Sequence, residues 1–320
     1  MYCIVFGLLV LFIILYFKIA DHFNIIDKPN ERSSHKHITL RGGGIIFYIG
    51  AILYFLFYGL KYPFFATGLS IIAIISFIDD IKALPFKVRL VFHFAAMLLM
   101  FYDCGLYSLP WYYTITALII SIGIINAYNF MDGINGITGG YSLVVIASFW
   151  YVNNYIVLFI DNNLLYIIAL SLLIFNVFNF RKRAICFAGD VGSVSIAFII
   201  VFLLGKLIVK TNDFTYIIIL LIYGVDTVLT IIHRLILKEN IFVAHRKHLY
   251  QLMSNELQIP HIWVSIIYMF VQSVVMVGYF SLKSNSIFYL FGSLALMVLI
   301  YIAFMQKYFK LHKKNVPDPY

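Results

Sequence analysis

Residues 126 to 140 read NAYNFMDGINGITGG, a polar and glycine-rich stretch between two long apolar segments. Asparagine, aspartate and repeated glycine suit the end of a membrane-spanning helix poorly, because their polar groups need partners and glycine leaves the backbone loose. A helix C-cap would need one Asn-Gly pair, whereas this stretch holds three asparagines, one aspartate and four glycines. The stretch therefore indicates a functional site at the end of a membrane span.

The composition of the whole chain indicates an integral membrane protein. The 320 residues are 63% hydrophobic and only 12% charged, whereas soluble domains are about 45–50% apolar. The net charge of +9 does not favour nucleic-acid binding, because no water-soluble domain is visible that could carry a basic face. The three cysteines are far apart and lack metal-ligand spacing, so neither a disulfide framework nor a cysteine metal site is expected.

Eleven apolar segments are long enough to cross the roughly 30 Å hydrocarbon core of a bilayer, with ten as the alternative count. They are 2–19, 44–60, 64–81, 88–104, 112–129, 140–158, 163–179, 193–209, 215–233, 262–281 and 286–305. The first positive charge, Lys18, follows the first apolar run, which favours an N-terminus outside over a cleaved signal peptide. The sequence therefore predicts an all-α, polytopic membrane bundle that forms a single domain over residues 1–320.

Basic residues divide the loops into two sets. Of the 23 lysines and arginines, 19 belong to one set, and the other set and its adjoining helix ends hold only Lys61, Lys206, Lys210 and Lys283. By the positive-inside rule the richer set is cytoplasmic, which also places the C-terminus inside. The chemically rich loops all belong to that set. We therefore expect one cytoplasmic active site, formed by loops 20–43, 79–89, 129–140, 180–193 and 234–261.

Two adjacent carboxylates, Asp79 and Asp80, follow the apolar run ISFI at the end of the third span. Adjacent carboxylates repel each other and are costly near hydrocarbon, so they normally need a cation or another partner. Lys82, Lys87 and Arg89 follow closely and could pair with them or hold a phosphate. The plain alternative is that both aspartates only reach the membrane interface.

Within the stretch quoted first, Asn129 lies in the last turn of the fifth span, and Asp132 and Asn135 follow it. Gly133 and Gly136 separate these polar residues. Glycines at such positions let a backbone approach a ligand closely. The three polar side chains are therefore candidates for contact with a bound substrate.

The sequence CFAGDVGS, residues 186 to 193, sets Asp190 between two glycines before the eighth span. Ser193 is expected to cap that helix, whose free N–H groups favour an anion. An aspartate and a neutral amide oxygen, with phosphate oxygens of a ligand, form a typical sparse shell for Mg²⁺. The plain alternative makes Asp190 a helix cap alone. Residues 41 to 44, RGGG, offer an anion further backbone N–H groups, a weaker signal.

A basic motif, AHRKHLYQ, covers residues 244 to 251. His245 and His248 lie three apart with Arg246 between them, and the glutamate of an HExxH zinc site is missing. The motif therefore favours a grip on phosphate or nucleotide over a metal site. Histidines in a cytoplasmic loop are often merely solvated, which is the plain alternative.

Taken in order, RSSH with RGGG, FIDD, NAYNFMDGING, FAGDVGS and HRKHLYQ resemble the polyprenyl-phosphate N-acetylhexosamine-1-phosphate transferase superfamily, from about Asp27 to Gln251. The resemblance is nearest to the initiators of O-antigen or capsule synthesis. It implies transfer of a sugar 1-phosphate from a UDP-N-acetylhexosamine to undecaprenyl phosphate, with release of UMP. It also implies Mg²⁺, with Mn²⁺ as an alternative, and a place in the bacterial inner membrane. A homodimer is a further expectation.

Carried over to this chain, the resemblance makes Asn129 and Asp190 the metal ligands, while Phe187 stacks on uracil and Asn135 hydrogen-bonds it. With the motifs themselves, the expected catalytic residues are Asp79, Asp80 and Asp132, and the other expected substrate contacts are Lys87, Arg89, His245, Arg246 and His248. One departure is visible. Bacterial members usually read DGxDG, whereas the second carboxylate is here Asn135, as in the eukaryotic N-acetylglucosamine-1-phosphate transferase.

A secondary transporter is the alternative from another class. Asp226 lies within the ninth span, and an intramembrane carboxylate is a functional candidate by default. A transporter predicts polar residues at mid-membrane in broken helices and an inverted repeat. Here the polar residues cluster at one interface instead. A purely structural membrane scaffold would leave the glycine-flanked acidic loops unexplained, so the sequence favours the enzyme.

Overall fold

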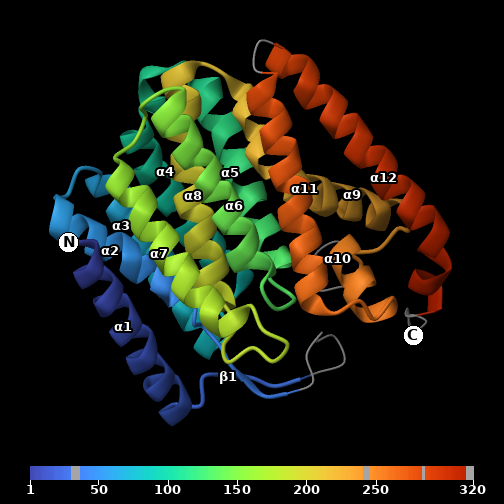
Figure 1. Ribbon diagram of the computed structural model, residues 1–320, viewed down its shortest axis with the longest axis horizontal. Helices are drawn as coiled ribbons and strands as arrows, with labels where there is room; N and C mark the ends of the chain where they lie inside the picture. The colour runs from blue at the N-terminus through green and yellow to red at the C-terminus, as the bar shows by residue number, and fades with distance from the viewer. Residues whose placement is uncertain (30–36, 241–245, 283–284, 315–320) are drawn as a thin grey trace.

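Long helices make up most of the molecule (Figure 1). The computed structural model describes residues 1–29, 37–240, 246–282 and 285–314. The helices are α1 (Tyr2–His22), α2 (Ile45–Tyr58), α3 (Pro63–Ile81), α4 (Phe86–Cys104), α5 (Trp111–Met131), α6 (Ile137–Tyr155), α7 (Asn162–Asn179), α8 (Gly189–Thr211), α9 (Leu221–Ile236), α10 (Leu249–Gln251), α11 (His261–Ser281) and α12 (Ser286–Lys314). Shorter elements are the antiparallel strands β1 (Ile26–Asp27) and β2 (Thr39–Leu40), the 3₁₀ turns η1 (Leu106–Ser108) and η2 (Phe214–Leu220), and the π turn η3 (Leu252–Glu256).

Each of the eleven predicted spans coincides with a helix of the described chain, although α12 continues past its predicted end. In the described residues, eight helical segments, including η2 with α9, are long and apolar enough to cross a membrane. Of the three remaining predicted spans, α2 has only 14 residues, and α4 carries Lys87, Arg89 and Asp103. The all-α polytopic fold is confirmed. The number of crossings and their direction stay predictions.

Helix α8 lies at the centre, in contact with α2, α3, α4, α5 and α6. Its residues are buried from Val191 to Leu204. Small residues let the neighbouring helices come close: a Cβ on Gly192 would lie 2.6 Å from the Cα of Gly44. Lipid is as apolar as these side chains, so close packing holds helices together in a bilayer. The start of α8 is therefore fixed in the middle of the bundle.

The ninth span changes from the 3₁₀ turn η2 to the helix α9, and a buried glutamine of α11 fills the break. Gln272 Oε1 accepts hydrogen bonds from the N–H of Ile222 (3.2 Å) and from the hydroxyl of Tyr141 (2.8 Å). Its Nε2 donates to the carbonyl oxygen of Ile218 at 3.0 Å. Backbone groups freed by a break need such partners inside a membrane. Beyond the break, α9 lies between α11 and α12 (Figure 1).

The connections that carry the polar motifs gather at one end of the bundle. In Figure 1 the strands after α1, the α5–α6 and α7–α8 loops and α10 all lie at the lower end. Two of these connections are joined by backbone hydrogen bonds, from Phe187 N to Leu40 O (2.8 Å), from Gly43 N to Phe187 O (2.8 Å) and from Gly44 N to Ala188 O (3.1 Å). The N–H groups of Gly43 and Gly44 are thus used within the fold, so the expectation that they serve an anion is wrong.

Candidate functional site

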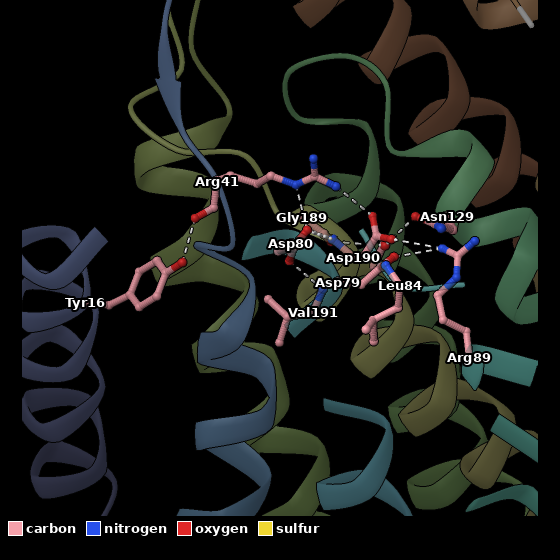
Figure 2. Close-up of polar contacts among 11 residues, drawn as sticks. Tyr16, Arg41, Asp79, Asp80, Leu84, Arg89, Asn129, Gly189, Asp190 and Val191 are labelled. Atoms are coloured by element: carbon pink, nitrogen blue, oxygen red, sulfur yellow. Dashed lines mark hydrogen bonds and ion pairs between the residues drawn. The ribbon is translucent and has the colours of Figure 1, made fainter. Parts of the chain in front are cut away.

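Asp80, in the last turn of α3, holds the start of α8. Its carboxylate oxygens accept hydrogen bonds from the backbone N–H of Asp190 (2.8 Å) and of Val191 (2.9 Å) (Figure 2). A carboxylate there satisfies free N–H groups and interacts favourably with the helix dipole. Gly189, at φ +71°, leaves room, since a Cβ there would lie 2.6 Å from Asp80 Oδ2. Helix α8 begins before its predicted start, and Ser193 lies one turn inside the helix instead of capping it.

A guanidinium that the sequence motifs did not predict, that of Arg41, joins Asp80 to Asp190. Its Nε lies 2.6 Å from Asp80 Oδ1, and its Nη2 lies 3.1 Å from Asp190 Oδ1. The hydroxyl of Tyr16 in α1 donates to the carbonyl oxygen of Arg41 at 2.6 Å, which anchors the loop. Burial lowers the pKa of Arg41, but the carboxylates of Asp80 and Asp190 raise it above its ordinary value. The side chain therefore stays charged.

The neighbouring carboxylate, Asp79, has different partners. Its Oδ1 accepts a hydrogen bond from the N–H of Leu84 at 2.5 Å, which orders the connection between α3 and α4. Its Oδ2 pairs with Arg89 Nη1 of α4 at 2.8 Å, and the same nitrogen lies 3.6 Å from Asp190 Oδ2. The adjacent pair is thus divided: Asp80 caps α8, and Asp79 shares Arg89 with Asp190.

The three carboxylates of this cluster outnumber its two guanidiniums. Asp79 and Asp190 both approach Arg89 Nη1 and interact with each other, and two ionised carboxylates this close repel each other unless a proton or a cation lies between them. With all five groups ionised, three carboxylates and two guanidiniums leave one net negative charge. We call these five side chains the aspartate cluster: Arg41, Asp79, Asp80, Arg89 and Asp190.

Asn129, at the end of α5, brings a neutral oxygen toward the cluster. Its Oδ1 accepts a hydrogen bond at 3.1 Å from the Oγ of Ser193, three residues after Asp190 in α8. The donors are all oxygens and the cluster has surplus negative charge, so the set fits Mg²⁺, a hard cation. Among the described residues, no group of three or more His, Cys, Asp or Glu side chains could hold a metal alone. Oxygens of a substrate would have to complete the shell.

The part of the chain that carries most of this cluster matches a known family. Residues 62–208 match the model of glycosyl transferase family 4. Over 261 residues the chain is 28% identical to the probable undecaprenyl-phosphate N-acetylglucosaminyl 1-phosphate transferase of Bacillus subtilis (strain 168). This alignment covers 73% of this chain and 70% of the relative. The chain is therefore similar to glycosyl transferase family 4 over these residues.

Two further proteins similar to this chain are undecaprenyl-phosphate alpha-N-acetylglucosaminyl 1-phosphate transferases. The one from Yersinia pestis is 27% identical over 207 residues, and the one from Escherichia coli (strain K12) is 26% identical over 219 residues. These alignments cover 58% and 61% of this chain but only 56% and 58% of the relatives, less than two thirds of their length. Arg41 lies outside the residues matched by the family model.

The loop after α5 carries two predicted site residues in different settings. Asp132 ends α5 and is half-buried; burial raises the pKa of Asp132 to about 6, and the charge of Asp80 adds to the effect. Asn135 is buried, and its Nδ2 donates to the carbonyl oxygens of Arg181 (2.8 Å) and Lys182 (3.3 Å). An ionised aspartate could not donate these bonds. The departure from DGxDG therefore suits a contact between two loops.

The glycines of the same loop make room for protein side chains. A Cβ on Gly133 would lie 2.2 Å from the hydroxyl oxygen of Tyr250. Gly136 has φ +84°, and a Cβ there would meet the ring of Phe180 at 2.3 Å. These two glycines were expected to bring the backbone close to a ligand. In the described residues, the space beside them is filled from α10 and from the end of α7.

Two predicted substrate contacts lie next to the aspartate cluster in sequence. Phe187 is half-buried three residues before Asp190, and its backbone is fixed by the bonds to Leu40 and Gly43. Lys87 is exposed at the start of α4, and within the described part of the chain it makes no ion pair with the aspartates. Roles in binding uracil and phosphate stay predictions for these two residues.

The predicted basic motif is only partly described, since His245 lies outside the described residues. Arg246 is half-buried. His248 is buried, begins α10, and its Nδ1 lies 3.4 Å from Asp226 Oδ1 of α9. Asp226 also accepts the N–H of Leu249 at 2.9 Å. The structure thus brings His248 to the intramembrane carboxylate, which serves to cap α10.

Proposed function

We propose that this protein transfers an N-acetylhexosamine 1-phosphate from a UDP-sugar to undecaprenyl phosphate. The observation that carries the proposal is that Asp79 and Asp190 share the guanidinium of Arg89 at one end of a membrane bundle, while Arg41 joins Asp190 to Asp80. Such a place suits a reaction between a soluble nucleotide and a lipid phosphate. The names of the relatives support the acceptor and the transferred group.

The proposed reaction is a phosphoryl transfer in one displacement. An oxygen of the lipid phosphate attacks the β-phosphorus of the UDP-sugar and forms a new P–O bond. The bond from that phosphorus to the bridging oxygen breaks, and UMP leaves with that oxygen. The product is a polyprenyl diphosphate sugar. A phosphate monoester with a second pKa near ~6 is mostly dianionic at neutral pH, so charge neutralisation and alignment matter more than a strong base.

Each side chain of the aspartate cluster has a role in this proposal. Arg41 and Arg89 neutralise phosphoryl oxygens, while Asp79 orients the lipid phosphate or accepts its remaining proton. Asp80 holds the first turn of α8, and Asp190 with it. Asp190 and Asn129 would hold Mg²⁺, or Mn²⁺ in its place, and the bound ion supplies charge neutralisation at the diphosphate.

The charge bias of the loops supports a site on the cytoplasmic face of the bacterial inner membrane. UDP-sugars are soluble nucleotides, and the acceptor phosphate lies at the membrane surface. In this proposal the reaction is the first membrane step in making a surface polysaccharide or a cell-wall glycan. Asp132 lies where it can contact the sugar or the reacting phosphate.

The test uses membranes that contain the protein, undecaprenyl phosphate and a panel of labelled UDP-N-acetylhexosamines. We expect UMP and a lipid-linked sugar in equal amounts with at least one sugar, and only when Mg²⁺ or Mn²⁺ is added. Membranes with Asp190→Ala are the control and should give neither product. Release of UDP instead of UMP, or no lipid product with any sugar, would overturn the proposal.

A further inference from the structure

A tyrosine of α10 fixes the backbone at the end of α5. Tyr250 is fully buried, and its hydroxyl donates to the carbonyl oxygen of Phe130 at 2.8 Å. Its ring crosses Gly133, where a Cβ would lie 2.2 Å from the hydroxyl oxygen. Asp132 lies between these two contact points. Tyr250 of α10 therefore contacts the backbone on both sides of Asp132, a predicted catalytic residue.

Tyr250 is itself held by the carboxylate within the ninth span. Asp226 is buried, and its oxygens accept the N–H of Leu249 (2.9 Å) and of Tyr250 (3.4 Å). The hydroxyl of Tyr268 in α11 donates to Asp226 Oδ2 at 2.6 Å. A buried carboxylate gives up such partners only at high cost. These contacts make α10 a fixed extension of α9 and α11.

Asp132 is close enough to the aspartate cluster for its charge to interact with that of Asp80. A shift of the loop would therefore change how Asp132 meets a substrate held by the cluster. Misplacing a reacting group by a fraction of an ångström lowers the rate more than it weakens binding, because alignment matters most in the transition state.

We propose that Tyr250 is a positioning residue: anchored through Asp226, it holds the backbone at Phe130 so that Asp132 stays in place. We call this set the α10 latch, formed by Asp226, Tyr250, Phe130 and Gly133. The inference rests on the proposed function, because it gives Asp132 a part in the reaction. It adds a residue that touches neither the aspartate cluster nor, in the proposal, the substrate.

The chain contains a matched control for the latch. In the described residues, Tyr289 of α12 donates to the carbonyl oxygen of Val275 at 3.1 Å, and a Cβ on Gly278 would lie 2.1 Å from its hydroxyl oxygen. As in the latch, the accepting carbonyl lies three residues before the glycine. This pair joins α11 to α12 and is far along the chain from the aspartates. It reproduces the hydrogen bond and the close contact without the proposed positioning role.

The first experiment compares Tyr250→Phe with Tyr289→Phe. Each loses one hydrogen bond, so we expect similar small falls in melting temperature. For Tyr250→Phe we expect kcat to fall about fivefold, from the loss of one hydrogen bond, with the KM for the UDP-sugar unchanged. Tyr289→Phe should keep the wild-type kcat. Equal kcat in both variants and the wild type would overturn the proposal.

A second experiment separates the latch from the proposed function. Amide hydrogen exchange of residues 131–136, measured without substrate, should be faster in Tyr250→Phe than in the wild type or Tyr289→Phe. Faster exchange in a protein that transfers no sugar would reject the proposed function and keep the latch. Unchanged exchange would reject the latch whatever the activity.

Discussion

Asp161 and Asp190 stand at the beginning of α7 and α8, two neighbouring segments of chain that start at opposite ends of the bundle. Asp161 caps its own helix by accepting the N–H of Asn163 at 2.9 Å, and it pairs with Lys61. Asp190 leaves the capping of α8 to Asp80, and its carboxylate contacts Arg41, Arg89 and Asp79 instead.

The two aspartates differ in what balances the negative charge of their carboxylates. At Asp161 the carboxylate meets one ammonium group, and Tyr54 and Asn163 donate further hydrogen bonds to it, so its charge is balanced within the fold. At Asp190 a second aspartate takes over the structural task, and a carboxylate is left against another carboxylate. An acidic residue at a helix start is usually only a cap. A cap supplied from another helix leaves the local aspartate available for a ligand.

The strongest test of this difference exchanges each aspartate for its amide. Asp190→Asn keeps the size of the side chain but removes the charge, and we expect transfer to fall about a thousandfold, as for the loss of a major electrostatic group in an active site. Asp161→Asn should leave transfer unchanged and lower only the melting temperature. Rates are measured as lipid-linked sugar formed in membranes with equal amounts of each protein. Comparable losses for the two variants would contradict the assignment.

The basic partners give a second, smaller contrast. Arg41→Met leaves Asp80 and Asp190 without their shared guanidinium, and we expect transfer to fall about a hundredfold. Arg41→Lys should recover only part of this, because one ammonium group cannot reach both carboxylates as a planar guanidinium does. Lys61→Met, at the opposite end, is the control. Full activity in Arg41→Met would show that Arg89 alone suffices.

The smallest expected effect is on pH dependence, where the two ends have opposite signs. Burial raises the pKa of Asp132 to about 6, so its contribution to stability is complete below its ordinary value of 3.8 and is lost as the pH rises through about 6. Burial also raises the pKa of Asp161, but Lys61 and the N–H of Asn163 lower it below its ordinary value overall. The contribution of Asp161 is therefore present above 3.8 and is lost as the pH falls through the lowered value.

Melting temperatures measured from about pH 4 to about pH 7 check the sign for Asp132. Asp132→Asn should remove the part of the decline in stability that falls between about pH 4 and about pH 6. Asp161→Asn should leave the slope in that range unchanged, because Asp161 is ionised throughout. Equal slopes in the wild type and Asp132→Asn would contradict the raised pKa of Asp132.

Apolar length and loop character predicted the eleven helices and the gathering of the polar loops at one end. Both patterns depend on the bilayer, which demands long apolar runs and places polar residues at its surfaces. Of the three basic residues expected to pair with Asp79 and Asp80, Arg89 pairs with Asp79, whereas Asp80 pairs with Arg41, which was not expected. The sequence signal for Arg41 was a charge directly before a glycine run at the entry to an apolar segment, which says nothing about where its side chain points.

Contacts between distant segments could not be predicted, because they depend on how the helices pack. Sequence order puts Asp79 and Asp80 side by side, but only the position of α8 gives one of them a helix to cap. Nothing in the sequence around Gly133 predicts its contact with the ring of Tyr250. Nor does His248 indicate that it will meet Asp226.

The break between η2 and α9 has a consequence for how the protein is made. Ile218 and Ile222 find their partner in Gln272, and Asp226 finds its donors in α10 and α11, all of which are synthesised later. Until then, polar backbone groups and a carboxylate of the ninth span lack these partners, which is costly in hydrocarbon. The ninth span is therefore expected to reach its final structure in the membrane only after α11 has been inserted. Completion of the active-site end thus waits for the C-terminal part of the chain.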